Sequence, residues 1–121
     1  MYSMGYYTDP ANSLERAQLD KKALIAAKLR LGPNMKVLDI GCGWGGFALY
    51  LNRHYGCEVL GVSLAPDQVK FANERAAAAG VAASCPSQAR RGSHAPAACR
   101  TTAVSCPVRN HRWARSGRSR V

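Results

Sequence analysis

The chain has 121 residues, enough for one small domain but fewer than a complete doubly wound α/β enzyme usually needs. It carries 17 Lys and Arg against 7 Asp and Glu, for a formal net charge of +10. Residues 1–82 hold 9 basic and 7 acidic side chains, whereas residues 83–121 hold 8 Arg and no Lys, Asp or Glu. The basic charge therefore belongs to a C-terminal segment, which excludes a uniformly basic domain.

The sequence does not support a membrane-spanning or secreted protein. No apolar run approaches the roughly 18–20 residues of a membrane span, and residues 1–7 have neither the charged nor the apolar region of a signal peptide. The 5 Cys are an odd number with no Cys-x-x-Cys spacing, which argues against a disulfide scaffold. The intervals between these Cys and the His residues are too irregular for a zinc site, so we assign no metal. We expect reduced thiols in a cytoplasmic protein.

The first predicted element is a helix that follows Asn12 and ends at Gly32-Pro33. Asn12 and Glu15 have the spacing of a capping box. Apolar residues recur along this segment at near-helical spacing: Leu14, Ala17, Leu24, Ala27 and Leu31. We expect these residues to form the apolar face of the helix.

Two strands and two helices follow in alternation. Residues 36–40 are a short apolar run with β-branched members, and a glycine cluster comes directly after it. The helix that follows the cluster stops at Gly56, and residues 58–63 make the second strand. Pro66 then opens a helix that Gly80 caps. This order predicts an α/β fold with a parallel sheet and right-handed crossovers.

Residues 83–121 show neither helical nor strand periodicity. Ala, Arg, Ser, Cys and Pro make up 27 of these 39 residues, and Leu, Ile, Met, Phe and Tyr are absent. Such a segment buries too little apolar surface to offset its ordering entropy, so we expect a disordered tail. An Arg-rich, Lys-free composition is typical of a GC-rich gene translated in the wrong frame, and we interpret this tail as a frameshift product.

The glycine cluster is the first functional signal. Gly41-x-Gly43-x-x-Gly46 matches the dinucleotide fingerprint in form. That fingerprint expects an acidic residue at the end of the second strand, where residues 61–64 contain none. No Gly-Lys-Ser/Thr follows to hold the phosphates of a nucleoside triphosphate. Neither NAD nor a triphosphate is therefore favoured.

Asp39 adds a carboxylate directly ahead of the glycine cluster. It would repel a diphosphate but attract a ligand with a cationic amine and a sulfonium centre. The aromatic rings of Trp44 and Tyr2 would add a cation–π attraction of about 0.5–2 kcal/mol. The pattern Asp-x-Gly-x-Gly-x-Gly therefore favours S-adenosylmethionine as the ligand.

Four segments together give the sequence a more specific likeness. They are residues 2–6 (YSMGY), 14–18 (LERAQ), 37–46 (VLDIGCGWGG) and 61–68 (GVSLAPDQ). This combination resembles the cyclopropane-fatty-acyl-phospholipid synthase and mycolic acid cyclopropane synthase family. The resemblance extends over about residues 2–82.

The resemblance implies an incomplete Rossmann-like fold of the S-adenosylmethionine-dependent methyltransferases. Residues 1–82 would be its first βαβα part with an N-terminal helix. Cofactor contacts are implied for the N-terminus, for the glycine turn and for the residues after the second strand. With Asp39, the candidate cofactor-binding residues are Tyr2, Ser3, Asp39, Gly41, Cys42, Gly43, Trp44, Gly45, Gly46, Ser63, Leu64 and Gln68. No catalytic residue is assigned.

The resemblance also implies a reaction and its partners. Members of the family transfer a methylene group from S-adenosylmethionine to the cis double bond of a lipid acyl chain, with bound bicarbonate as the base. The implied substrates are the unsaturated acyl chains of phospholipids, with peripheral contact at the inner membrane face. Nucleic acid is not an implied partner.

The sequence departs from the family in three places. Met4 and Gly5 stand where members tend to have Cys and Ala near the bicarbonate, which weakens that implication for this chain. Ala65 lacks the usual hydroxyl of a helix N-cap, worth about 1 kcal/mol. The bicarbonate-binding residues and the acyl-chain pocket have no counterpart after Ala82. We therefore expect a truncated, inactive enzyme.

An alternative of another class is a small basic protein that binds nucleic acid or an anionic membrane through its Arg-rich tail. The tail carries eight Arg but only one aromatic residue, Trp113, so it would stack poorly on bases. Salt separates the two functions, because binding by the tail should fall steeply with salt and cofactor binding should not.

Overall fold

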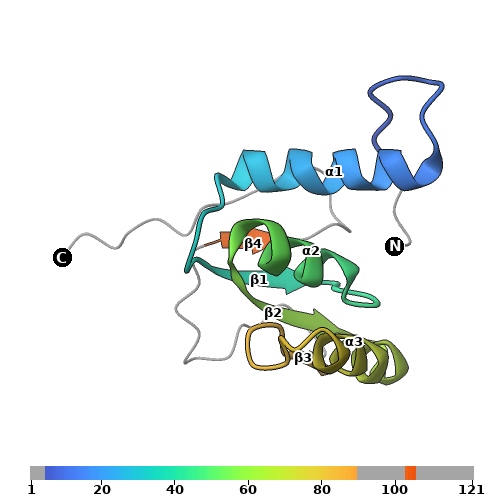
Figure 1. Ribbon diagram of the computed structural model, residues 1–121. Helices are drawn as coiled ribbons and strands as arrows, with labels where there is room; N and C mark the ends of the chain where they lie inside the picture. The colour runs from blue at the N-terminus through green and yellow to red at the C-terminus, as the bar shows by residue number, and fades with distance from the viewer. Residues whose placement is uncertain (1–4, 90–102, 106–121) are drawn as a thin grey trace.

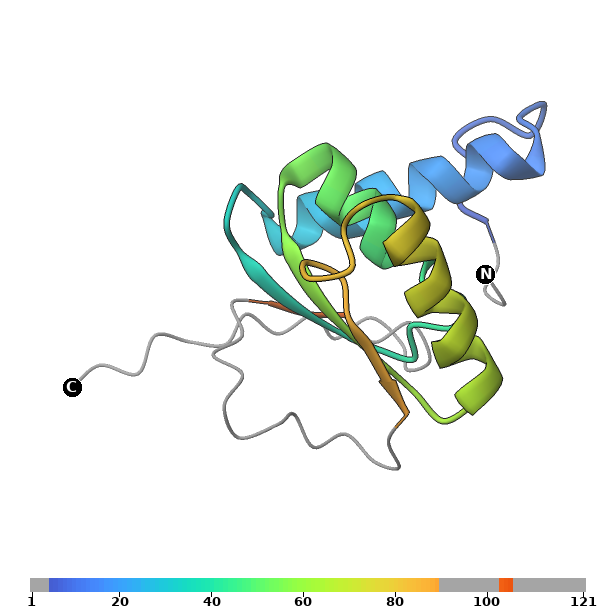
Figure 2. The same ribbon diagram turned by 60° about the horizontal axis from the view of Figure 1, so that its bottom comes forward.

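The computed structural model describes residues 5–89 and 103–105 of the chain. Its centre is a parallel sheet of four strands in the order β3-β2-β1-β4. The helices α1, α2 and α3 lie together on one face of this sheet (Figures 1 and 2). The predicted α/β class and parallel strand arrangement are confirmed.

The first helix, α1 (Leu14–Leu29), is capped by Ser13, whose hydroxyl accepts a hydrogen bond from the Arg16 amide. The capping box predicted from Asn12 is therefore wrong, because the Asn12 side chain donates to Thr8 instead. Arg30, in the left-handed region at φ 50°, ends the helix before Gly32.

The buried face of α1 also differs from the predicted one. Leu14 is 56% exposed and Ala27 is exposed, although both belong to the predicted apolar face. The residues that α1 buries are Ala17, Ile25, Ala26 and Leu29. This helix is rich in alanine, so the spacing of its apolar residues fits more than one buried face. Packing against the rest of the core decides which face is buried.

The two central strands have the predicted bounds, β1 (Lys36–Ile40) and β2 (Glu58–Ser63). They pair in parallel, so that Asp39 lies opposite Gly61. Val37 and Val59 are each 1% exposed and belong to the main hydrophobic cluster. Burial on both faces explains why these strands are nearly continuous apolar runs rather than alternating ones.

The helices between the strands also follow the predictions. α2 (Gly46–Tyr55) ends at Gly56, and α3 (Pro66–Ala78) begins with proline in its first turn. Ala65 at the N-cap of α3 makes no side-chain hydrogen bond, as expected from its missing hydroxyl. None of the helices in the described residues is long and apolar enough to span a membrane.

The ordered chain continues beyond the predicted boundary at residue 82. Residues 87–89 form β3 (Ser87–Ala89), which pairs with β2, and residues 103–105 form β4 (Ala103–Ser105), which pairs with β1. The expectation of disorder from residue 83 is therefore wrong for these two strands. The remainder of the tail, residues 90–102 and 106–121, lies outside the described residues.

Main-chain hydrogen bonds explain how a segment without apolar periodicity joins the sheet. The amides of Val59 and Gly61 donate to the carbonyls of Ser84 and Pro86 at 2.7 and 2.9 Å. From α3, the amide side chain of Asn73 both donates to and accepts from the backbone of Ser87. These bonds need no particular side chain on β3, so the sequence of residues 83–89 gives little sign of them.

Candidate functional site

The glycine turn after β1 has a backbone that favours glycine at three positions. Gly41, Gly43 and Gly45 have φ angles of 83°, 53° and 75°, all in the left-handed region. The amides of Gly41 and Cys42 both donate to the carbonyl of Val62 at the end of β2, at 2.8 and 3.1 Å. The turn is therefore fastened to the carboxyl edge of the sheet, where ligands of open α/β sheets bind.

Two of these glycines have different surroundings. A Cβ at Gly45 would lie 2.8 Å from the Cβ of Ala72, so the turn packs directly on α3. A Cβ at Gly43 would meet no heavy atom of the described residues within 4 Å. Gly45 is thus required for packing, whereas Gly43 presents open backbone that a ligand can approach.

Asp39 is buried beneath this turn, with 1% of its surface exposed. Burial, together with the negative charge of Asp39, raises the pKa of the neighbouring Cys42 thiol from 9.0 to about 11. Cys42 is itself only 7% exposed, and its Sγ lies 2.9 Å from the Cβ that Gly61 lacks. The Cys42 thiol is therefore a protonated packing group and not a nucleophile.

A second group of candidate residues lies at the end of β2. The Ser63 hydroxyl donates to Oε1 of Gln68 at 3.1 Å and accepts from the amide of Ala65 at 3.3 Å. Leu64, between them, is 73% exposed. Because Ile40 and Val62 are paired, this group adjoins the start of the glycine turn.

Trp44 is held by α3 through contacts that the sequence analysis did not foresee. Its indole meets the ring of Phe71 edge-on, with 5.3 Å between centroids and an interplanar angle of 88°. Nη1 of Arg75 donates to the Trp44 carbonyl at 3.2 Å, and the guanidinium lies 5.8 Å from the Phe71 ring centre. Phe71 and Arg75 are four residues apart, a spacing that puts both on one helix face and is the only signal that pointed to them.

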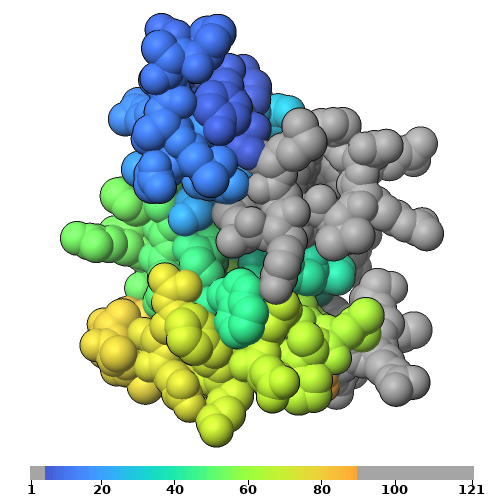
Figure 3. All heavy atoms as spheres, turned by 90° about the vertical axis from the view of Figure 1, so that its right-hand side faces the viewer, coloured from blue at the N-terminus to red at the C-terminus, as the bar shows by residue number. Residues whose placement is uncertain are grey.

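The structure thus brings most of the candidate residues to one edge of the sheet. Asp39, the six residues from Gly41 to Gly46, Ser63 and Gln68 surround the carboxyl ends of β1 and β2. Figure 3 shows the segment after β1 (turquoise) reaching the surface between the N-terminal part of the chain (blue) and α3 (yellow-green). Tyr2 and Ser3 lie outside the described residues.

Metal-binding side chains do not gather in the part of the chain that the structure describes. No group of three or more His, Cys, Asp or Glu side chains occurs there. Cys57 and Cys85 are free thiols buried in the hydrophobic core, and burial raises the pKa of both. His94, His111, Cys99 and Cys106 fall outside the described residues.

Comparison with known proteins identifies relatives of this chain. Residues 1–89 match the family model described as mycolic acid cyclopropane synthetase. The chain is 50% identical over 74 residues to cyclopropane-fatty-acyl-phospholipid synthase from Escherichia coli (strain K12), a match that covers 61% of this chain and 19% of the relative. The chain therefore spans about a fifth of the length of that relative.

Solved structures agree with the sequence match. The cyclopropane synthase MmaA2 from Mycobacterium tuberculosis superposes with a TM-score of 0.70 at 29% identity, over 74% of this chain and 31% of that chain. Mycolic acid cyclopropane synthase CmaA1 complexed with SAH and CTAB gives 0.70 at 30% identity over the same shares. The described fold is the first part of the Rossmann-like methyltransferase fold, and the chain belongs to the mycolic acid cyclopropane synthetase family.

Proposed function

We propose that the glycine turn and its neighbours bind S-adenosylmethionine, as part of a methyltransferase of the cyclopropane-fatty-acyl-phospholipid synthase type. The observation that carries the proposal is a buried carboxylate, Asp39, beneath a left-handed turn whose Gly43 backbone is open to a ligand. A carboxylate in this place favours a cationic ligand and opposes a diphosphate. The CmaA1 structure with SAH supports the same assignment.

The chain offers groups that fit each part of this cofactor. The backbone amides of the glycine turn and the start of α2 suit the carboxylate of the methionine part, because a helix N-terminus favours negative charge. The charge of Asp39 suits the ammonium and sulfonium groups. Ser63, Leu64 and Gln68 offer polar and apolar contacts to the ribose and the adenine.

When bound, S-adenosylmethionine supplies an electrophilic methyl group. The residues described here would orient it: the glycine turn fixes one end, and the Ser63–Gln68 pair fixes the other. No residue described here is assigned as the base that removes a proton, and bicarbonate is not assigned to this chain.

The acceptor that we propose for the whole enzyme is the unsaturated acyl chain of a phospholipid, met at the inner membrane face. Support comes from the E. coli relative, whose name is cyclopropane-fatty-acyl-phospholipid synthase, and from the complex of CmaA1 with CTAB. The alternative function through the Arg-rich tail gains no support, because all eight of its Arg residues lie outside the described residues.

Equilibrium titration with S-adenosylmethionine and NAD tests the proposal. We expect S-adenosylmethionine to bind with a dissociation constant in the high micromolar to millimolar range, because the family match ends at residue 89 and the matched residues supply only part of a closed pocket. The affinity should change little between low and moderate salt. Tighter binding of NAD than of S-adenosylmethionine would contradict the proposal.

A further inference from the structure

The guanidinium of Arg75, on α3, lies against the glycine turn. Its Nη1 donates to the carbonyl of Trp44 at 3.2 Å, and a Cβ at Gly46 would lie 3.7 Å from the same nitrogen. The guanidinium carbon lies 5.8 Å from the centre of the Phe71 ring, one helical turn earlier. Arg75 therefore contacts the turn, the start of α2 and an aromatic ring of its own helix.

The Trp44 carbonyl lies between two glycines with a left-handed backbone. The first two amides of the turn are fixed to the end of β2, whereas Gly43 and Gly45 flank Trp44 further along. Glycine has more backbone freedom than any other residue, so this part of the turn needs other restraints. The Gly45 amide donates to the Cys42 carbonyl at 3.1 Å, within the turn, and the Trp44 carbonyl accepts from Arg75. Arg75 thus ties the peptide unit between Trp44 and Gly45 to α3.

An ion pair does not explain where this guanidinium lies. Among the described residues, no carboxylate pairs with Arg75. Burial, and then the positive charge of Arg75, lower the pKa of Lys22 on α1, so the guanidinium is within electrostatic reach of another cation. Two neighbouring positive charges repel each other. The position of Arg75 is therefore unfavourable for its charge, and its contacts with the turn and with Phe71 hold it there.

We propose that Arg75 is a positioning residue: it holds the Trp44 carbonyl so that the glycine turn keeps the backbone conformation that receives the methionine end of S-adenosylmethionine. The inference rests on the proposed function. Gly43, directly before Trp44, presents open backbone, so a rotation at Trp44 changes the surface that a ligand would contact. A turn that is held before the ligand arrives loses less conformational entropy on binding. The nucleoside end, assigned to Ser63 and Gln68, does not depend on this hydrogen bond.

Three variants separate positioning by Arg75 from a general loss of charge or stability. Arg75→Met removes the guanidinium but keeps an aliphatic side chain, and we expect it to weaken S-adenosylmethionine binding roughly three- to fivefold through the lost hydrogen bond. Arg53→Met is the matched control for charge, because Arg53 is exposed in the last turn of α2, away from the glycine turn. Gly80→Ala is the control for stability, because it strains the backbone just after α3. Both controls should leave the affinity unchanged.

The two ends of the cofactor provide a readout that a purely structural role would not change. Methylthioadenosine lacks the amino-acid end, so Arg75→Met should leave its dissociation constant unchanged while that of S-adenosylmethionine rises. An equal loss for both ligands, or a loss for S-adenosylmethionine no larger than that of Gly80→Ala, would reduce Arg75 to a structural role and overturn the inference. Unchanged S-adenosylmethionine binding by Arg75→Met would also overturn it alone, whereas no binding by the wild type would overturn the proposed function as well.

Discussion

Asp39 is the residue on which the choice of ligand depends. Asp39→Asn keeps the size of the side chain but removes the charge that favours an ammonium and a sulfonium group. We expect the dissociation constant for S-adenosylmethionine to rise roughly tenfold, equivalent to about 1.4 kcal/mol. The matched control is Glu58→Gln, at the exposed amino end of β2, which should leave the affinity unchanged. Equal affinity of the wild type and Asp39→Asn in titration would exclude a direct role for the charge.

The raised pKa of Cys42 makes the stability of the fold depend on pH. The pKa of its thiol is raised to about 11 in the folded chain from an ordinary value of 9.0, so the folded state holds its proton more tightly than the unfolded state does. The stability contributed by this thiol is complete below pH 9 and is lost as the pH rises to about 11.

The Cys42→Ala variant checks this pH dependence. Its free energy of unfolding should fall less between pH 9 and pH 11 than that of the wild type, because the variant has no thiol to titrate. Denaturant titrations at several pH values measure both slopes, and other groups that titrate in this range contribute equally to each. Identical slopes would show that the Cys42 pKa is not raised by folding.

The contact between the glycine turn and α3 decides how precisely these elements are held. Gly45→Ala introduces two costs, a left-handed φ of 75° and a Cβ 2.8 Å from that of Ala72. Gly80→Ala is the matched control, because its φ is 72° and a Cβ there meets no described heavy atom within 4 Å. We expect Gly80→Ala to cost about 1 kcal/mol of unfolding free energy through backbone strain alone. Gly45→Ala should cost about 1–3 kcal/mol more through overpacking, as measured by urea unfolding; equal costs would mean that the turn does not pack tightly on α3.

α3 also connects the turn with the sheet edge. Its Phe71 and Arg75 hold Trp44, and its Asn73 holds the backbone of Ser87 in β3. One face of α3 therefore holds the glycine turn, and another face holds β3, the next strand in the chain. Little in the sequence of α3 indicates this role, but the helix positions the candidate site.

At the scale of the whole molecule, we expect the chain not to catalyse cyclopropanation by itself. Among the described residues we assign cofactor contacts but neither a base nor an acyl-chain site, and we expect these residues alone not to stabilise the transition state. Lipid analysis of cells that depend on this chain alone should find no cyclopropane fatty acids. Their detection would refute both this prediction and the interpretation of the tail as a frameshift product.

The frameshift interpretation has its own test. If the reading frame changes near codon 82, another frame of the gene downstream should encode a family-like sequence, and restoring it should give a protein that melts cooperatively. Deleting residues 83–121 should lower the free energy of unfolding, because it also removes β3 and β4. The absence of a family-like sequence from every other downstream frame would require the interpretation to be abandoned.

The sequence by itself determined the elements whose signals are local. The bounds of β1 and β2, the turn at Gly41 to Gly46 and the ends of α2 follow from short apolar runs and from glycines at special backbone positions. Such signals lie within a few neighbouring residues, so a single sequence carries them. The local pattern around Asp39 was sufficient to indicate the class of ligand, and four short segments in combination indicated the family.

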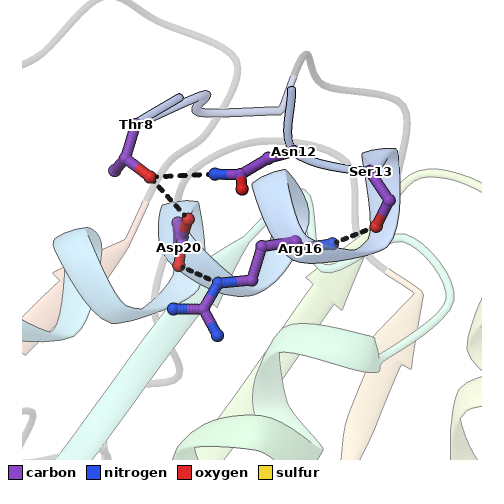
Figure 4. Close-up of polar contacts among 5 residues, drawn as sticks. All are labelled: Thr8, Asn12, Ser13, Arg16 and Asp20. Carbon is purple, nitrogen blue, oxygen red and sulfur yellow. Dashed lines mark hydrogen bonds and ion pairs between the residues drawn. The ribbon is translucent and has the colours of Figure 1, made fainter. Parts of the chain in front are cut away.

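Only the tertiary structure decided which surfaces meet. It selected the face of α1 that is buried, paired Trp44 with Phe71, joined Thr8 to Asp20 by a hydrogen bond (Figure 4), and added β3 at the sheet edge. Each of these contacts joins groups that are separated along the chain or whose alternatives are nearly equal in sequence. The hydrogen bonds of β3 are made by the main chain, which is chemically the same at almost every residue. No pattern of side chains therefore predicts them.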